Sequence, residues 1–492
     1  MSEPGARDGI DGPGVRLSAV WVAAALLLPP AISLASRLTT IDLAYTVRAG
    51  QVMLATGDVL RVDLFTFTAH CDPWLNQQWG AQVMLAGVFG GLGWLGLALV
   101  RAALAAAVAV FTYGACRAYG AERRPAAWLT LLSWLPHLGG QLRAQFFGLL
   151  LFTVALWLVA ERVKHPRRLP WAIPLLLVWA NLHGSFPLGV VVLAFAWIED
   201  RVAGRSGRGT AVVTVLATLA TFVTPFGPRV WPYTIELSSD PLIRELIPEW
   251  QPPWTSIPIG ILFFATVAIA IAVFVRNRRE LAWPAWLQLG VFLVLGLSSM
   301  RSLFWWLIVL AITLARLPWA RRPATADPRN RLNVALVGVF ALLPLIAAVR
   351  WLPYGGNDAP EHLLGFAPEP LTAELREILE PGEPFANPQA WGSWFELTLP
   401  DHPVYADSRI EVVPDDVLRS SFTIQRADPG WQEELDAIGM RVLVIDRLTQ
   451  PDLVDAIGSN DAWREVYADE DGIVLVREGR DPVERLPPCP PS

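Results

Sequence analysis

Residues 94–116 read WLGLALVRAALAAAVAVFTYGAC, an apolar run interrupted by a single charge, Arg101. A helix needs about 20 apolar residues to cross a bilayer, and this run meets that length. Further apolar runs, separated by polar breaks, lie at residues 17–36, 125–139, 142–161, 170–182, 185–199, 210–224, 257–275, 281–298, 302–316 and 332–350. The sequence therefore predicts a polytopic α-helical membrane protein with about 11 transmembrane helices.

The first run, residues 17–36, follows Arg7 and Arg16. A cleaved signal peptide also begins with basic residues and an apolar run, but its apolar region is shorter. The length of the run and the many later runs favour a first transmembrane helix.

Composition divides the chain into regions. The 492 residues are 53% hydrophobic and 17% charged, whereas soluble proteins carry about 25% charged residues. The deficit lies in the apolar part, so we predict an N-terminal tail (1–16), a membrane domain (17–353) and a soluble domain (354–492). The net charge of −6 argues against a general nucleic-acid binder.

The soluble domain shows alternating strand and helix patterns. Strands are predicted at 403–406, 441–445, 463–467 and 473–477, and helices at 415–426, 430–438 and 451–457. This indicates a small α/β domain, in which Asp407-Ser408-Arg409 is the best candidate site, although a plain ion pair explains it better. The cysteines, Cys71, Cys116 and Cys489, are odd in number and widely spaced, so they predict neither a zinc motif nor a disulfide.

The basic residues predict the orientation of the chain. The segments 117–124, 162–168, 201–208, 276–279 and 316–331 hold 18 arginines and lysines, against 7 in the alternate loops. Cytoplasmic loops carry the excess of positive charge. The N-terminus is therefore predicted inside, and the C-terminal domain outside, where most of the unusual polar residues also lie.

The first outer loop, residues 37–79, opens with a segment that can form an amphipathic helix, from Ile41 to Ala55, ended by Gly57. Asp42 falls in its first turn. There the carboxylate either complements the helix dipole or serves as a catalytic base at the membrane surface. The residues leave both interpretations open.

Two tight outer hairpins carry polar side chains. Asn181 and His183 join two apolar runs almost without a loop, and they either cap the helices or, for His183, bind a phosphate or a sugar hydroxyl. Arg301 stands alone at another hairpin, where it either reaches lipid head groups or pairs with a phosphate.

The outer loop 224–256 ends in Glu249-Trp250-Gln251. Loops of this length between helices are commonly functional. A tryptophan face can stack on a sugar ring while a carboxylate accepts hydrogen bonds from its hydroxyls, so Glu249 and Trp250 are candidate sugar-binding residues. A rigid interfacial loop is the alternative.

Several motifs together resemble a group of bacterial multi-pass membrane proteins. They are Asp42, Arg48-x-Gly50, Asp63-x-Phe65-Thr66-x-Thr68, Pro73-Trp74, Asn181-Leu182-His183-Gly184, Pro225-Phe226-Gly227, Glu249-Trp250-Gln251, Trp391-Gly392 and Asp407-Ser408-Arg409. That group in turn resembles the GT-C membrane glycosyltransferases, the superfamily that includes the protein O-mannosyltransferases.

The resemblance implies transfer of a hexose or pentose from a polyprenyl-phosphate donor to a glycan or protein acceptor, outside the cytoplasm at a bacterial plasma membrane. It implies that Asp42 is the general base. We further predict substrate contacts from Arg48, Asn181, His183, Glu249, Trp250 and Arg301. GT-C enzymes often carry an acidic pair in this loop, whereas Leu43 follows Asp42 here. No metal ligand is therefore predicted, and a requirement for a divalent cation stays open.

Two other classes of function compete with this interpretation. A transporter or flippase of lipid-linked glycans should show ionisable residues inside its spans and an internal repeat, yet the spans are nearly free of charge apart from Arg101. A non-catalytic membrane scaffold that displays the C-terminal domain would be favoured if Asp42, His183 and Arg301 tolerated alanine.

Overall fold

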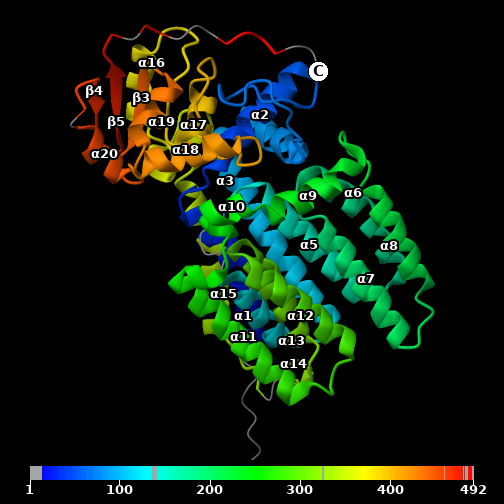
Figure 1. The fold of residues 1–492 in the computed structure, drawn as a ribbon. Helices are drawn as coiled ribbons and strands as arrows, with labels where there is room; N and C mark the ends of the chain where they lie inside the picture. Colours follow the sequence, from blue (N-terminus) through cyan, green and yellow to red (C-terminus); the bar gives the residue numbers. More distant parts are fainter. Residues whose placement is uncertain are drawn as a thin grey trace, which may run out of the picture.

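The computed structural model is mostly helical, with a small sheet near the C-terminus (Figure 1). It describes residues 14–135, 141–323, 326–458, 460–479, 481–482 and 486–489. The predictions for residues 1–13 of the N-terminal tail and for residues 136–140 of the second outer segment lie outside the described residues.

Every predicted apolar run coincides with a helix, so the helical pattern is confirmed. The helices are α1 (Leu17–Ala35), α3 (Trp79–Ala118), α4 (Arg123–Trp134), α5 (Ala144–Glu161), α6 (Ala172–Leu182), α7 (Pro187–Val202), α8 (Arg208–Ala220), α11 (Ile257–Asn277), α12 (Trp283–Ser298), α13 (Leu303–Ala315) and α15 (Arg331–Val349). Five of them, α1, α3, α5, α11 and α15, are long and apolar enough to cross a bilayer. The exact number of spans stays a prediction.

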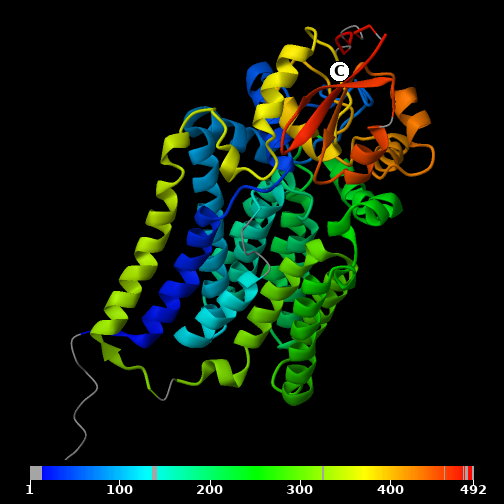
Figure 2. The same cartoon turned by 90° about the vertical axis from the view of Figure 1, so that its left-hand side faces the viewer.

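The helices differ in what surrounds them. Every residue of α13 from Trp305 to Ala315 is buried, so α13 lies at the centre of the bundle. In contrast, α15 packs against α1 (Figure 2) but buries Asn333 alone and leaves most of its apolar side chains exposed. An exposed apolar helix surface of this kind matches contact with lipid rather than water.

The glycine-containing residues 79–93 are helical and continuous with the apolar run at 94–116. Both belong to α3, whose geometry departs from helical at Gly93, with a φ of 53°. A side chain at Gly93 would be strained at this φ, and its Cβ would overlap the carbonyl oxygen of Gly356. Gly93 therefore bends α3 and leaves space for the backbone of Gly355 and Gly356, which follow α15.

Short helices cover the end of the bundle that faces the sheet. The predicted surface helix of the first outer loop is present as α2 (Asp42–Thr56) and ends at Gly57, which has a φ of 77°. The other short helices outside the sheet region are α9 (Val230–Ser239), α10 (Pro241–Leu246) and, at the opposite end of the bundle, α14 (Pro318–Arg321).

The C-terminal region combines helices with an antiparallel sheet in the order β3-β5-β4. Its elements are α16 (Glu369–Ile378), α17 (Gln389–Thr398), α18 (Asp415–Gln425), α19 (Trp431–Ile438), β3 (Val442–Asp446), α20 (Pro451–Ile457), β4 (Trp463–Ala468) and β5 (Gly472–Arg477). Three predicted strands and all three predicted helices are confirmed. The strand predicted at 403–406 is wrong, because Val404 makes only isolated bridges, to Thr66 and Phe385, and no ladder extends from them.

A buried arginine joins the first outer loop to the C-terminal region. Arg409 is fully buried, and its guanidinium lies 2.6 Å from Asp63 Oδ1 and 3.4 Å from Glu396 Oε1, and it pairs with Asp407. The rings of Phe65 and Trp74 lie 4.9 and 4.8 Å from the guanidinium carbon. The predicted Asp407–Arg409 ion pair is present, and it also binds the loop that carries Asp63. We call the contact of Arg409 with Asp63, Asp407 and Glu396 the Arg409 joint.

A disulfide links the same two parts of the chain, although the cysteine spacing predicted none. Cys71 of the first outer loop pairs with Cys489, 418 residues later. Sequence spacing could not reveal this pair, because the two cysteines meet only through the packing of the whole C-terminal region. The prediction from spacing is therefore wrong, and Cys116 is a free, buried cysteine.

At the opposite end of the bundle, the part of the chain that the structure describes contains a second buried ionic network. Arg162 lies 3.0 Å from Glu199 and 3.1 Å from Asp200, and Arg316 lies 2.6 Å from Glu199. The network fastens α5, α7 and the end of α13 together. Two arginines on the predicted cytoplasmic side thus have a structural role.

The buried joint gives a stability prediction. Replacing Arg409 with Met leaves Asp63, Asp407 and Glu396 buried without their cation, which should cost about 3–5 kcal/mol. Thermal unfolding of the detergent-purified protein should show a clearly lower midpoint for Arg409→Met. Arg447→Met, at an exposed position of the same region, is the matched control and should leave the midpoint unchanged; equal midpoints for the two variants would contradict the role given to Arg409.

Candidate functional site

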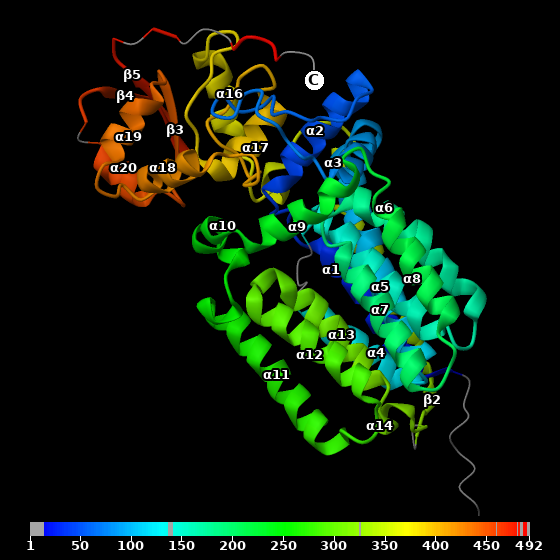
Figure 3. The same cartoon turned by 45° about the vertical axis from the view of Figure 1, so that its right-hand side comes forward.

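Several of the segments that carry the predicted site residues, among them α2 and the end of α6, lie at the end of the bundle next to the C-terminal region (Figure 3). Asp42 begins α2, and His183 follows α6. Glu249 lies in a short helix, Pro248–Trp250, and Arg301 lies in another, Met300–Ser302. The backbone N–H of Met300 donates to the carbonyl of Gln251 at 2.9 Å, so the last two helices are held together.

Arg143, at the start of α5, is the centre of the cluster. Its Nη1 donates to both carboxylate oxygens of Glu249, at 3.1 and 2.8 Å, and its Nε lies 3.5 Å from Asp42 Oδ2. The Arg143 side chain is 12% exposed and that of Asp42 is 22% exposed. A single guanidinium thus connects the carboxylate of α2 to the carboxylate of the 224–256 loop.

Arg301 approaches Glu249 from the other side. Its Nη1 lies 3.2 Å from Glu249 Oε1, and its guanidinium carbon lies 4.5 Å from the centre of the Trp250 ring. Gln145 accepts a hydrogen bond from Arg301 Nη2 at 3.3 Å. Burial alone would raise the pKa of Glu249, but Arg301 and Arg143 outweigh burial and hold it below its ordinary value. Glu249 is therefore an anion shared by two cations.

His183 is held in one tautomer near the two arginines. The backbone N–H of Ser185 donates to His183 Nδ1 at 3.0 Å, which leaves the ring proton on Nε2. Burial, together with the charges of Arg301 and Arg143, lowers the pKa of His183 from 6.5 to about 3. His183 is therefore a neutral imidazole at physiological pH, able to donate a hydrogen bond from Nε2 but not to supply a positive charge.

A carboxyl group of the C-terminal region lies beside the same cluster. Burial raises the pKa of Glu411 to about 7; the charge of Arg409 opposes this rise, and the carboxylates of Asp407 and Asp42 add to it. The charge of Glu411 also acts on the phenols of Tyr45 in α2 and Tyr233 in α9. Glu411 thus titrates near neutral pH, and the charge of Asp42 contributes to the rise of its pKa.

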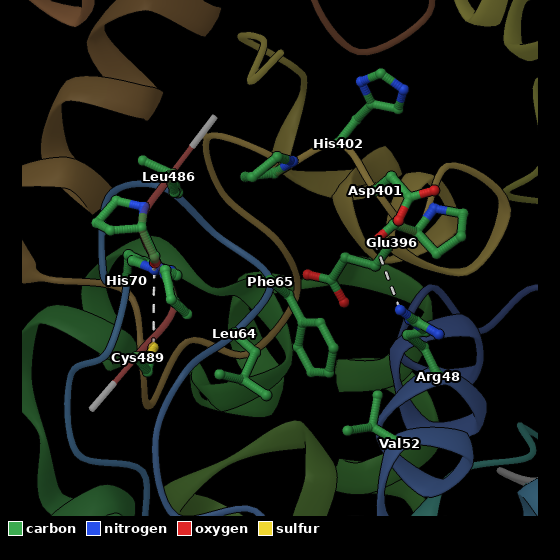
Figure 4. A pocket seen from close by; sticks show the side chains of 14 residues that line it. Arg48, Val52, Leu64, Phe65, His70, Glu396, Asp401, His402, Leu486 and Cys489 are labelled. Atoms are coloured by element: carbon green, nitrogen blue, oxygen red, sulfur yellow. Dashed lines mark hydrogen bonds between the residues drawn. The ribbon is translucent and has the colours of Figure 1, made fainter. Parts of the chain in front are cut away.

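Arg48 and Asn181 lie apart from the cluster. Arg48 lines a separate cavity of about 660 Å³ with Phe65, His70 and Glu396 (Figure 4). The Asn181 side-chain oxygen accepts from Trp79 Nε1 at 2.9 Å, and its nitrogen donates to the carbonyls of Leu177 and Val223. These bonds engage the amide of Asn181 with the packing of α3, α6 and the end of α8.

Three residues of the cluster were not singled out from the sequence. In the sequence, Arg143 is one of the seven basic residues of the alternate loops. Like Arg301, it stands directly before an apolar run, and this position could have identified it as a candidate. Gln145 and Glu411 gave no such signal. Glu411 is influenced by the charge of Asp42 because the C-terminal region packs against α2.

Within the described residues, one group of His, Cys, Asp and Glu side chains has metal-ligand spacing: His70, Cys71 and Cys489. Its two sulfurs are joined in the disulfide, so they are not available as thiolate ligands. In the cluster around Arg143, both Asp42 and Glu249 face guanidinium groups. Whether the protein requires a divalent cation therefore stays open, since the described residues contain no other group with this spacing.

The arrangement of the helices and the C-terminal region is similar to that of solved membrane proteins. The chain is similar to the archaeal oligosaccharyltransferase AglB from Archaeoglobus fulgidus, solved with an inhibitory peptide and a dolichol-phosphate, with 12% identity, a TM-score of 0.51, and coverage of 94% of this chain and 74% of that chain. The apo form of the A. fulgidus enzyme matches with 13% identity and the same TM-score and coverage.

ArnT from Cupriavidus metallidurans, solved with undecaprenyl phosphate, matches 93% of this chain and 97% of its own at 15% identity and a TM-score of 0.48. No family model and no curated protein sequence matches the chain. The chain has the fold of the GT-C multi-pass membrane glycosyltransferases, as the motifs of its outer loops indicated. At these identities the likeness concerns the fold.

The position of Glu411 gives a pH prediction. Because its pKa in the folded protein, about 7, lies above the ordinary 4.5, the wild type loses stability as the pH rises through that interval. Glu411→Gln removes this loss, so its unfolding midpoint relative to wild type should rise between about pH 5 and pH 8. Glu433→Gln, at an exposed site, is the control, and a parallel pH dependence in all three proteins would contradict the assignment.

Proposed function

We propose that this protein is a glycosyltransferase that moves a sugar from a polyprenyl-phosphate carrier to an acceptor hydroxyl at the outer surface of the membrane. The observation that carries the proposal is the convergence of Asp42, Arg143, Glu249 and Arg301 from four separate segments. A carboxylate beside paired guanidinium groups suits a reaction with a proton to remove and a phosphate to release.

Asp42 is the proposed base. Its side chain is 22% exposed, so a substrate hydroxyl can reach it, and Arg143 at 3.5 Å fixes the direction of its carboxylate. Asp42 takes the proton as the acceptor oxygen attacks the anomeric carbon. The bond from that carbon to the phosphate oxygen breaks, and the carrier leaves as the polyprenyl phosphate, so the displacement inverts the anomeric centre.

Arg143 and Arg301 are the proposed phosphate-binding groups. Planar guanidinium groups match phosphate oxygens, and their charge stabilises the negative charge that develops on the leaving phosphate. They share Glu249, whose side chain is 37% exposed, so an incoming phosphate can compete for their donors. His183 adds a neutral Nε2 donor, and Trp250 adds an aromatic face for the sugar. The dolichol-phosphate in the AglB structure supports a lipid phosphate as the donor group.

The proposal includes the predicted orientation, with about 11 spans between residues 17 and 353, a cytoplasmic tail (1–16), and residues 354–492 outside a bacterial plasma membrane. Two independent features support this orientation. The arginine-rich loops lie at the end of the bundle that is remote from the cluster, and the Cys71–Cys489 disulfide lies at the end that carries it. Disulfides persist in oxidising compartments outside the cytoplasm.

The role of Asp42 is tested by the Asp42→Asn variant in a transfer assay with membranes and radiolabelled polyprenyl-phosphate sugars. Loss of a positioned general base should lower turnover about 100-fold or more. Asp58→Asn, at an exposed position of the same loop, should keep wild-type turnover. Equal turnover of Asp42→Asn and wild type would remove Asp42 as the base, and absence of turnover in the wild type with every donor would favour the scaffold.

The role of Arg301 is tested in the same assay. Arg301→Gln removes one cation from the leaving phosphate and should lower kcat about 100-fold, whereas Arg301→Lys, which keeps the charge, should lose less. Arg244→Gln in the exposed part of the 224–256 loop is the matched control and should behave as wild type. A change in KM alone, with kcat unaltered, would show that Arg301 binds donor without assisting the departure of the phosphate.

A further inference from the structure

A cavity of about 1090 Å³ lies beside α14 and β2 (Arg329–Asn330). Figure 3 shows these two elements at the end of the bundle remote from α2. Three segments form its walls. They are the start of α1, the start of α4, and residues 319–323 and 327–329 of α14, β2 and their flanks. β2 pairs with β1 (Val15–Arg16).

The carboxylate of Asp327 links the segments that line this cavity. It accepts from the backbone N–H and the hydroxyl of Ser18, at 2.8 and 2.7 Å, and from Arg124 Nη2 at 2.7 Å. The three segments are therefore fastened to one another through a single carboxylate. The cavity is a fixed feature of the fold and not a gap between independent loops.

The charge that lines the cavity is strongly positive. Two acidic residues, Glu122 and Asp327, face five arginines: Arg16, Arg123, Arg124, Arg322 and Arg329. Both acids already have partners, because Asp327 binds Arg124 and Glu122 lies 3.8 Å from Arg117, outside the cavity. Among the residues that the structure describes, the other four arginines have no carboxylate within 4.0 Å.

Two tryptophans line the same cavity and are unusually exposed for their size. Trp128 is 44% exposed and Trp319 is 40% exposed. Tryptophan is enriched at the level of the lipid head groups, where its ring meets apolar chains and its N–H meets water. Arginines beside such rings therefore lie at the depth of the lipid phosphates.

We infer that this cavity binds the phosphate head group of an anionic phospholipid. Guanidinium groups supply paired donors to phosphate oxygens, and basic pockets between transmembrane helices on the cytoplasmic side recognise anionic head groups. The volume accommodates a head group, since ligand pockets measure roughly 300–1,000 Å³. The lipid acts as a bridge between α1, α4 and the α14–β2 segment, at a site separate from the cluster around Arg143, and the inference does not depend on the proposed transfer reaction.

The test uses the full chain, purified in a neutral detergent, and native mass spectrometry with added lipid. Dioleoyl phosphatidylglycerol should bind saturably, whereas dioleoyl phosphatidylcholine, which carries no net charge, should bind much more weakly. Inorganic phosphate is added in a third arm. If millimolar phosphate displaces the lipid completely, or if the two lipids bind alike, the assignment to an anionic lipid is overturned.

The site is localised with two double variants of equal charge change. Arg123→Gln with Arg322→Gln removes two cavity arginines and should weaken phosphatidylglycerol binding about tenfold to thirtyfold, from about 1 kcal/mol per basic residue. Arg278→Gln with Arg279→Gln removes two exposed arginines between α11 and α12 and should leave the affinity unchanged. Equal weakening in both proteins would show general attraction to basic loops and would overturn the site.

Discussion

The burial of Arg409 constrains the end of the molecule that carries α2 and the C-terminal region. A guanidinium with no solvent exposure needs carboxylates and hydrogen bonds around it, since an unpaired buried charge is very costly. Asp63 of the first outer loop and Glu396 of α17 supply them together with Asp407. The two parts of the chain therefore cannot separate without exposing this network, and α2, which carries Asp42, is fixed between them.

The same constraint explains much of the pattern that resembles other multi-pass proteins. Asp63, Phe65, Trp74 and Arg409 meet in this joint. Gly392 belongs to it as well, because a Cβ there would overlap the carbonyl oxygen of Ala406, next to Asp407. These residues hold the first outer loop against the C-terminal region, whereas the residues proposed to touch substrate lie around Arg143. A motif shared by such proteins therefore reports both how the outer loop is anchored and what the site contains.

The sequence predicted those elements whose cause is local. Apolar runs and helix-ending glycines depend on neighbouring residues, so the helices and the end of α2 at Gly57 were predicted well. Contacts between distant segments were not predictable in this way. The Cys71–Cys489 pair and the position of Glu411 depend on how the C-terminal region docks. The central place of Arg143 depends on how α2 and the 224–256 loop meet the start of α5. The failed strand at 403–406 has the same origin, since Val404 bridges two different segments.

In the cluster, positive and negative side chains are equal in number, and this balance bears on the proposed reaction. Arg143 and Arg301 are matched by Asp42 and Glu249, and His183 stays neutral because burial and the two guanidinium charges oppose its protonation. In the free site, the carboxylate of Asp42 lies 3.5 Å from Arg143 Nε. In the proposed reaction, a phosphate draws the guanidinium donors away from Glu249, so that the same cations face the leaving group while Asp42 remains available to accept a proton. Under this proposal, sharing Glu249 keeps the two arginines paired before the donor arrives and leaves their donors exchangeable when it does.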